Sequence, residues 1–282
     1  MNRAILGAVA IVGAVQLTAM PAQAESKIDA VKALKAELAR GRAVNVQATA
    51  KMTFTPTLVT TSSLEGTIGF DQRGAAASDV AQTVRYSKDL LRSMTRLDRE
   101  ETEALQQGPV QLISSRTASY VAGPVVDQTL QRQGASWVRY RNTELPPSNL
   151  IVEVLEPDTL KTLLAKPASV RDGVVKGSIR TSKLAAVSPA FASRFGSHSK
   201  KGKKGRDGKV AYTLWLGPTG LVERVAAKAV IPFYDGSVQV ESSTRFSDWG
   251  RQATVLLPLE GDVIDQGQVK DSVPEDVPGI WN

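Results

Sequence analysis

The sequence predicts a single α+β domain built on a large, curved antiparallel sheet, and three observations lead to this fold class. Apolar and polar residues alternate over many short segments, which is the period of two that half-buried strands require. Helical periodicity is limited to a few segments, near the N-terminus and in the middle of the chain. No fixed-period repeat and no Pro/Gly/Ser-rich linker divides the 282 residues. In such a domain the helices pack against an antiparallel sheet.

The clearest prediction is a three-stranded antiparallel meander. Residues alternate between apolar and polar along 209–217, 221–231 and 237–246. Between the first two strands, the sequence GPTG at 217–220 places proline and glycine where a type I turn prefers them. Between the second and third strands, the Asp-Gly pair at 235–236 is a strong hairpin signal because both residues tolerate positive φ.

The first 24 residues have the form of a secretory signal peptide. Arg3 precedes an apolar run at 4–15, and Ala22-Gln23-Ala24 is a small-x-small cleavage site. The alternative is an uncleaved membrane anchor, but the apolar run is shorter than the roughly 20 residues that span a bilayer. We therefore expect cleavage after Ala24 and a mature protein that is secreted or resides in the extracytoplasmic cell envelope.

The chain contains no cysteine. An exported protein without disulfides is held by its core alone, and a mature chain of this length buries enough surface for that. Lipid attachment through a cysteine after the signal is also excluded. The folded domain is expected at 25–258, followed by an acidic C-terminal tail at 259–282.

The N-terminal part of the domain combines one helix with several strands. Residues 25–40 carry a helical apolar stripe, with Ser26 as a cap at the start and Gly41 as a stop. Residues 88–107 fit either a helix or an exposed charged loop. Strands are predicted at 44–54, 63–70, 80–86, 110–116, 118–122 and 136–141.

Two short helices are inserted in the middle of the chain. The first covers 159–164. The second covers 183–195, with Thr181 or Ser182 as its cap, and Pro189 is expected to shorten or kink it. The remaining strands are predicted at 174–180 and, after the meander, at 252–257.

The net charge of +7 comes mainly from one Gly/Lys-rich segment, the basic loop. Its basic residues include Lys200, Lys201, Lys203, Lys204 and Arg206. The loop has no interleaved aromatic residues for stacking bases and the chain is exported, so we expect no nucleic-acid partner. The loop either contacts an anionic membrane or an acidic partner, or it is a solvated insertion.

No set of residues predicts catalysis or metal binding. The single histidine, His198, has no neighbouring group to orient it, and a zinc site needs several Cys or His ligands. The acidic run at 98–103 is typical of a solvated face. We therefore expect a protein that is not an enzyme and has no catalytic residue, metal site or cofactor.

The apolar face of the meander is the candidate ligand-binding surface. The small residues Ala226, Ala227 and Ala229 leave space either for a ligand or for the helices at 157–164 and 183–195. The opposite face is an alternative, because alternation does not determine which face is concave. The candidate lining residues are Tyr212, Leu214, Leu216, Val225, Ala227, Val238 and Val240.

Four segments resemble the actinobacterial lipoproteins of the LppX/LprG type. They are 134–140 (GASWVRY), 174–182, 210–224 (with YTLWLGPTGLVER) and 244–250 (TRFSDWG), within a resemblance over 26–258. The wider group is similar to the LolA/LolB lipoprotein carriers. The resemblance implies a half-barrel wrapped around a few helices, with a hydrophobic cavity and no enzymatic activity. Those lipoproteins carry a lipid-modified cysteine where this chain has Ala24-Glu25, and this difference favours a soluble shuttle or a sensor that works with a membrane partner.

Two functional hypotheses follow. The first is a secreted, monomeric carrier that binds lipids or lipoproteins in a hydrophobic cavity. The alternative is an extracytoplasmic regulatory or interaction domain of the same fold with a filled core, which contacts a membrane or protein partner through the basic loop. An interior cavity of roughly several hundred cubic ångströms favours the carrier. A closed core with an exposed basic patch favours the alternative.

Overall fold

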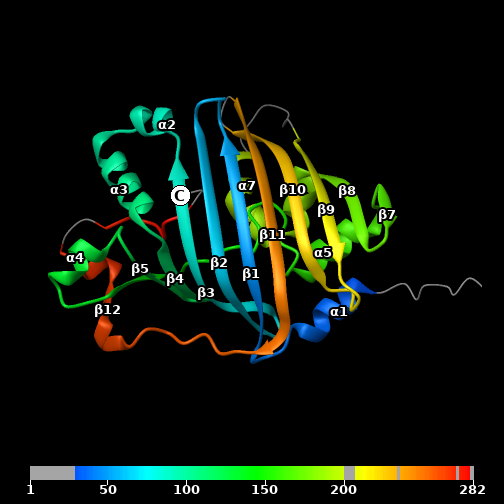
Figure 1. Cartoon of the computed structure of the whole chain (residues 1–282), viewed down its shortest axis with the longest axis horizontal. Helices are drawn as coiled ribbons and strands as arrows, with labels where there is room; N and C mark the ends of the chain where they lie inside the picture. Colours follow the sequence, from blue (N-terminus) through cyan, green and yellow to red (C-terminus); the bar gives the residue numbers. More distant parts are fainter. Residues whose placement is uncertain (1–28, 200–206, 234–235, 271–272, 280–282) are drawn as a thin grey trace, which may run out of the picture.

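An open, mostly antiparallel sheet carries the fold in the computed structural model (Figure 1). The structure describes residues 29–199, 207–233, 236–270 and 273–279. The predicted signal peptide, the helix cap Ser26, the basic loop at 200–206, the side chain of His198 and Asp235 of the predicted hairpin all lie outside the described residues.

Twelve strands of the described residues make up this sheet. They are β1 (Arg42–Thr53), β2 (Val59–Asp71), β3 (Gly74–Tyr86), β4 (Val110–Ser115), β5 (Ala118–Ala122), β6 (Trp137–Arg141), β7 (Ser169–Arg171), β8 (Val174–Arg180), β9 (Lys209–Leu216), β10 (Val222–Phe233), β11 (Gly236–Gln252) and β12 (Val263–Asp265). Their spatial order is β12-β6-β5-β4-β3-β2-β1-β11-β10-β9-β8-β7. Only β12 and β6 pair in parallel. The sheet does not close into a barrel, and the predicted α+β class with a large antiparallel sheet is confirmed.

The predicted meander is confirmed as β9, β10 and β11. Gly220 N–H donates to the Gly217 carbonyl at 2.9 Å and closes the turn between β9 and β10. β11 continues to Gln252, beyond the predicted end at 246, and its other edge pairs with β1. The pairing with β1 is irregular around Gly250, which has a positive φ and lies so close to the Glu37 carboxylate that a side chain there would collide with it.

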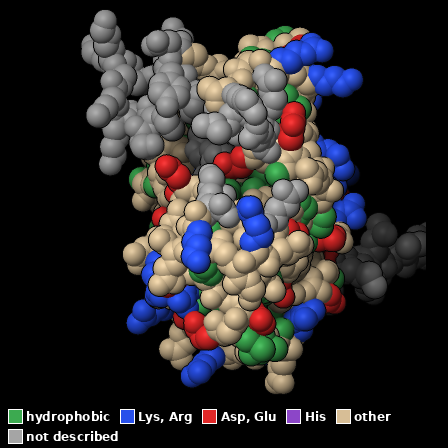
Figure 2. All heavy atoms as spheres, turned by 90° about the vertical axis from the view of Figure 1, so that its left-hand side faces the viewer, with side chains coloured by type: hydrophobic (Ala, Val, Ile, Leu, Met, Phe, Trp, Pro, Cys, Tyr) green, Lys and Arg blue, Asp and Glu red, His purple; other side chains and the backbone are tan. Residues whose placement is uncertain are grey.

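The strand predicted at 252–257 is wrong, because residues 253–259 have no regular secondary structure. Both edges of β11 are already paired, so the chain that follows finds no free edge there. It crosses the outer face of the sheet, where Val255 packs against a cluster that contains Tyr120. The chain then reaches the free edge of β6, where it forms β12. Figure 2 looks onto this end of the sheet, where charged side chains of both signs are interspersed.

The helices of the described residues fall between the strands. They are α1 (Ala30–Glu37), α2 (Lys88–Ser93), α3 (Arg96–Gln107), α4 (Asp127–Gln131), α5 (Pro157–Ala165), α6 (Thr181–Val187) and α7 (Pro189–Ser199), with the short 3-10 helices η1 (Glu260–Asp262) and η2 (Gln266–Gln268). The ambiguous segment 88–107 forms the two helices α2 and α3. Pro189 divides the predicted helix at 183–195 into α6 and α7, as its missing N–H requires. Neither α4 nor β7 was predicted.

The two helix caps differ from the predicted ones. The Asp29 carboxylate accepts hydrogen bonds from the first backbone N–H groups of α1. At α6, the cap is the carboxylate of Asp207, which accepts from the N–H and the hydroxyl of Ser182 at 2.9 and 2.8 Å and from the Thr181 hydroxyl. A negative charge is favourable at a helix N-terminus. Because Asp207 follows the basic loop, local sequence patterns could not identify this cap.

The inner face of the sheet, which carries Val44, Val46 and Met52 of β1, holds the main core. Helices α5, α6 and α7 contact β8 and β10 on this face. A buried segment, 148–155, lies against β11 on the same face and also belongs to the core. The alternation of side chains along each strand therefore separates this core from the polar outer face.

Asn149 fastens the buried segment to β11. Its Nδ2 donates to Thr244 Oγ1 at 3.0 Å, and its Oδ1 accepts from Ser242 Oγ at 2.7 Å. The same Oδ1 accepts from the backbone N–H groups of Ile151 and Val152 at 3.1 and 2.9 Å. A loop buried in a core leaves its backbone groups without water, so these side-chain bonds supply the partners they need.

Replacing Asn149 with Ala should lower the free energy of unfolding by about 3 kcal/mol, because several buried groups lose their partners together. Urea unfolding followed by circular dichroism measures this loss. The matched control is Gln72→Ala in the exposed turn between β2 and β3, which should change stability by less than about 0.5 kcal/mol. Equal stabilities for the two variants would contradict this role of Asn149.

Candidate functional site

A cavity of about 440 Å³ lies on the inner face of the sheet. One side is made of strand residues whose side chains share this face: Ala48, Ala50, Ser62, Leu64, Gln82, Leu112 and Tyr140. The other sides come from residues 141–147 and Leu150, from Ser193 and Arg194 of α7, and from the C-terminal residues Gln266 and 275–279. The cavity therefore joins segments that are far apart in the sequence.

The cavity exists because the side chains at its centre are small. Ala50 pairs with Ser62 of β2 on one side and with Ser242 of β11 on the other. Ala48 is the next inner-face residue of β1, and larger side chains such as Val46 and Met52 fill the face on either side. Small side chains on a concave surface leave room for a ligand.

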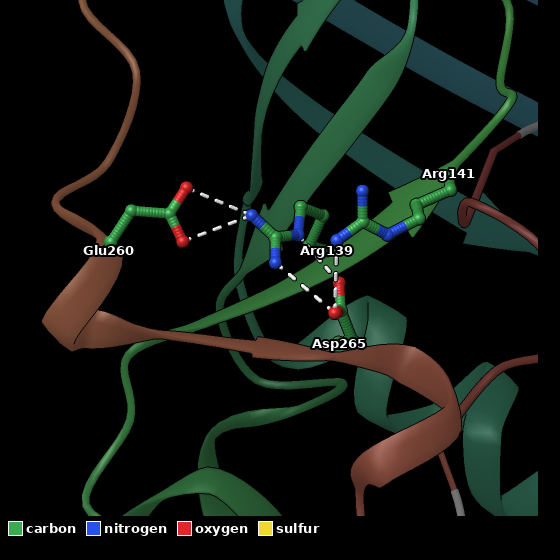
Figure 3. Close-up of polar contacts among 4 residues, drawn as sticks. All are labelled: Arg139, Arg141, Glu260 and Asp265. Atoms are coloured by element: carbon green, nitrogen blue, oxygen red, sulfur yellow. Dashed lines mark hydrogen bonds and ion pairs between the residues drawn. The ribbon is translucent and has the colours of Figure 1, made fainter.

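The C-terminal chain is held to the edge of the sheet by ion pairs (Figure 3). Arg139 Nε lies 2.5 Å from Asp265 Oδ1, and Arg141 Nη2 lies 3.1 Å from Asp265 Oδ2. Arg139 Nη1 also pairs with Glu260 Oε1 at 2.9 Å. The hydrogen bonds from Arg139 and Arg141 lower the pKa of Asp265 to about 2. These contacts hold β12 against β6.

Beyond this clamp, the C-terminal chain forms one wall of the cavity. The Tyr140 hydroxyl donates to the carbonyl of Pro274 at 3.0 Å, and burial raises the pKa of this tyrosine. Val273 and Val277 pack against the main core, and residues 275–279 line the cavity. Part of the predicted acidic tail is thus an ordered component of the site.

A buried carboxylate and a half-buried guanidinium lie close to the cavity. Glu153 accepts hydrogen bonds from the Ser148 N–H at 2.8 Å, the Ser148 hydroxyl at 2.5 Å and the Leu155 N–H at 3.0 Å. Burial raises the pKa of Glu153 in spite of these bonds. Burial also lowers the pKa of Arg194, and the negative charge of Glu153 opposes that shift.

The seven residues predicted to bind a ligand lie together on the inner face of β9, β10 and β11. Six are buried in the core, and Leu216 packs against the core while partly buried. The Tyr212 hydroxyl donates to the Leu163 carbonyl of α5 at 2.7 Å. Tyr212 and Ala227 also border a second, shallow hollow of about 650 Å³. A direct contact of these seven residues with a ligand stays a prediction.

The residues that line the 440 Å³ cavity were largely missed by sequence reasoning. The alternation of β1 indicated that Ala48 and Ala50 share a face, and their small size was the available signal. The segment 141–147, Leu150 and Arg194 had no such signal. Among the described residues, no group of three or more His, Cys, Asp or Glu side chains is placed to hold a metal ion.

None of the helices in the described residues has the length and apolar character needed to cross a membrane.

Comparison with known proteins identifies similar solved structures only. No family model and no curated protein matches the chain. A LolA-superfamily protein from Nitrosomonas europaea is similar, with a TM-score of 0.26 and 7% identity over 80% of this chain and 93% of that chain. The Pseudomonas aeruginosa MucA/MucB complex gives a TM-score of 0.12 and 8% identity over 78% and 94% of the two chains. MucB in complex with MucA(peri) gives 0.10 and 11% identity over 78% and 93%.

TM-scores this low carry no argument about function. The fold class therefore rests on the sheet itself, and the predicted relation to actinobacterial lipoproteins of the LppX/LprG type stays a prediction.

The clamp at Asp265 should make stability depend on pH. The folded pKa of Asp265 lies below its ordinary value, so the stabilisation is present above about pH 4 and is lost as the pH falls through about 2. Asp265→Asn should therefore be less stable than the wild type near pH 7, and the difference should shrink between about pH 4 and 2. Urea unfolding at several pH values measures it. Asp262→Asn is the control, and a pH-independent difference for Asp265→Asn would contradict the assignment.

Proposed function

We propose that the protein is a non-enzymatic carrier that holds an acyl chain or a lipidated ligand in the inner-face cavity. The observation that carries the proposal is the cavity of about 440 Å³, floored by Ala48, Ala50, Leu64 and Leu112. Ligand pockets in proteins measure roughly 300–1,000 Å³. Each buried CH₂ group contributes about 0.8 kcal/mol, so an acyl chain binds such a surface without directional contacts.

The seven meander residues belong to this proposal as the packed base next to the cavity. Ser242 connects the two regions, because it pairs with Ala50 at the cavity and with Ala227 in the meander. Helices α5, α6 and α7 pack on this part of the sheet. A ligand longer than the cavity would reach the seven residues only if these helices moved.

The proposed carrier is secreted, is cleaved after Ala24 and acts as a soluble monomer. Support for export comes from the form of residues 1–24, and support for a soluble protein comes from the lack of a cysteine that could be lipid-modified after the signal. The cell envelope supplies acylated ligands, and the basic loop would let the carrier approach an anionic membrane.

The second candidate is a regulatory or interaction domain that recognises a protein. The observation in its favour is that α5, α6 and α7 pack against β8 and β10 and fill the core on that part of the inner face. The basic loop that would contact the partner lies outside the described residues. The cavity beside the filled half supports the carrier instead, so ligand binding separates the two functions.

Filling the cavity tests the carrier. Ala50→Phe places a large side chain among the small residues and should weaken the binding of a fluorescent fatty acid by at least about tenfold. Overpacking a filled core costs about 1–3 kcal/mol, whereas a side chain that enters an existing cavity leaves stability nearly unchanged. Fluorescence titration and urea unfolding measure the two effects.

Gln47→Phe is the matched control for this test. It places the same side chain on the exposed outer face of β1 and should leave fatty-acid binding unchanged. Unaltered fatty-acid binding by Ala50→Phe would overturn the carrier, and so would wild-type protein that takes up neither a fatty acid nor any other single-chain amphiphile.

A further inference from the structure

We infer that the ligand carries one anionic head group, a carboxylate or a phosphate, which pairs with Arg194 at the wall of the cavity. This inference rests on the proposed carrier function and names the chemical class of its ligand. Three observations support it: Arg194 has free donors, the carboxylates of Glu153 and Glu156 are already hydrogen-bonded, and the other acidic groups around the cavity are exposed.

Arg194 has more donors than the protein uses. A guanidinium presents five N–H donors in a planar fork. Within the described residues, its hydrogen bonding is limited to one long contact, from Nη1 to the Leu150 carbonyl at 3.5 Å. No carboxylate of the described chain forms an ion pair with it within 4.0 Å. Arg194 is half-buried and lines the cavity, so its remaining donors are available to a molecule inside.

The buried carboxylate of Glu153 and the partly buried carboxylate of Glu156 are engaged elsewhere. Glu153 accepts its three hydrogen bonds from Ser148 and Leu155. Glu156 accepts from the Thr159 hydroxyl at 2.7 Å and from the Ala190 N–H at 3.0 Å, and so joins the starts of α5 and α7. These bonds hold both carboxylates in place. The negative charges of Glu153, Glu144 and Glu156 oppose the lowering of the Arg194 pKa by burial. A guanidinium stays protonated in proteins, so its planar fork can pair with a bidentate anion.

The other charged groups of the cavity lie at its rim. Glu144, Glu275 and Asp276 line the cavity and are exposed to solvent, where water and salt screen their charge. Arg141 is also exposed, and it already pairs with Asp265 at 3.1 Å. The negative charges of Glu153, Glu144 and Glu156 also act on Arg194, so the anion pairs with it through the bidentate, charge-assisted contact that a carboxylate or phosphate makes with a guanidinium.

The volume of the cavity limits how many acyl chains the ligand can place inside it. A volume of about 440 Å³ is near the lower end of the range for small-molecule pockets. With a single free guanidinium in its lining among the described residues, the cavity fits one acyl chain with one anionic group. A large lipid with several chains would exceed this volume.

The experiment compares three probes with the same alkyl chain: a fatty acid, an alkyl phosphate and the neutral fatty alcohol. Wild-type protein should bind at least one of the two anions about tenfold or more tightly than the alcohol, and the better anion identifies the head group. Arg194→Met keeps the apolar stem and removes the charge, so it should lose the preference for the anion while binding the alcohol as before. Arg194→Lys should retain part of the preference.

Arg92→Met is the matched control, because it removes an exposed cation of α2 that already pairs with Asp89 and lies outside the cavity lining. It should retain the preference for the anion. Equal binding of anion and alcohol by the wild type would overturn the anionic head group and leave the carrier intact. Failure of all three probes to bind would overturn the carrier itself. The wild-type comparison remains decisive even if Arg194→Met fails to fold.

Discussion

The hydrogen bonds between Asn149 and β11 are the interaction on which the arrangement of the inner face depends. They hold a buried, irregular segment against Ser242 and Thr244, in a place where unpaired backbone groups would be costly. Thr244 completes the attachment by donating to the Ser148 carbonyl at 2.6 Å. The segment then leads into α5 on one side of β11. The inner face is therefore filled on that side and hollow over β1 and β2, where the side chains are small.

The C-terminal chain closes the hollow side from the opposite end of the sheet. Asp265 brings two arginines of β6 together and holds a three-residue strand that has few hydrogen bonds of its own. From there the chain returns to the inner face and contacts Tyr140 through the Pro274 carbonyl. The cavity wall is thus formed by residues that local sequence patterns describe only as an acidic tail. Their position depends on charged groups more than 120 residues earlier in the chain.

The distribution of charge around the cavity follows from burial. Carboxylates that enter the core are fixed by several hydrogen bonds, as Glu153 is, and those without such partners stay at the solvent-exposed rim. Arg194 differs from both groups, since it is half-buried and has one long hydrogen bond. A cavity with a mostly apolar floor and one available cation suits an amphiphile better than a wholly apolar or a polar molecule.

The sequence by itself determined the antiparallel strands, the meander with its β9–β10 turn, the break at Pro189 and the α+β class, because these depend on side-chain alternation and local backbone chemistry. Only the tertiary structure decided which pairings were possible. The segment 252–257 alternates like a strand but finds no free edge beside β11, and β12 forms where β6 offers one. Likewise, Asp207 caps α6 from beyond the basic loop. The cavity was beyond sequence reasoning because Ala50, Arg194 and 275–279 meet only through strand pairing and long-range ion pairs, which no local pattern records.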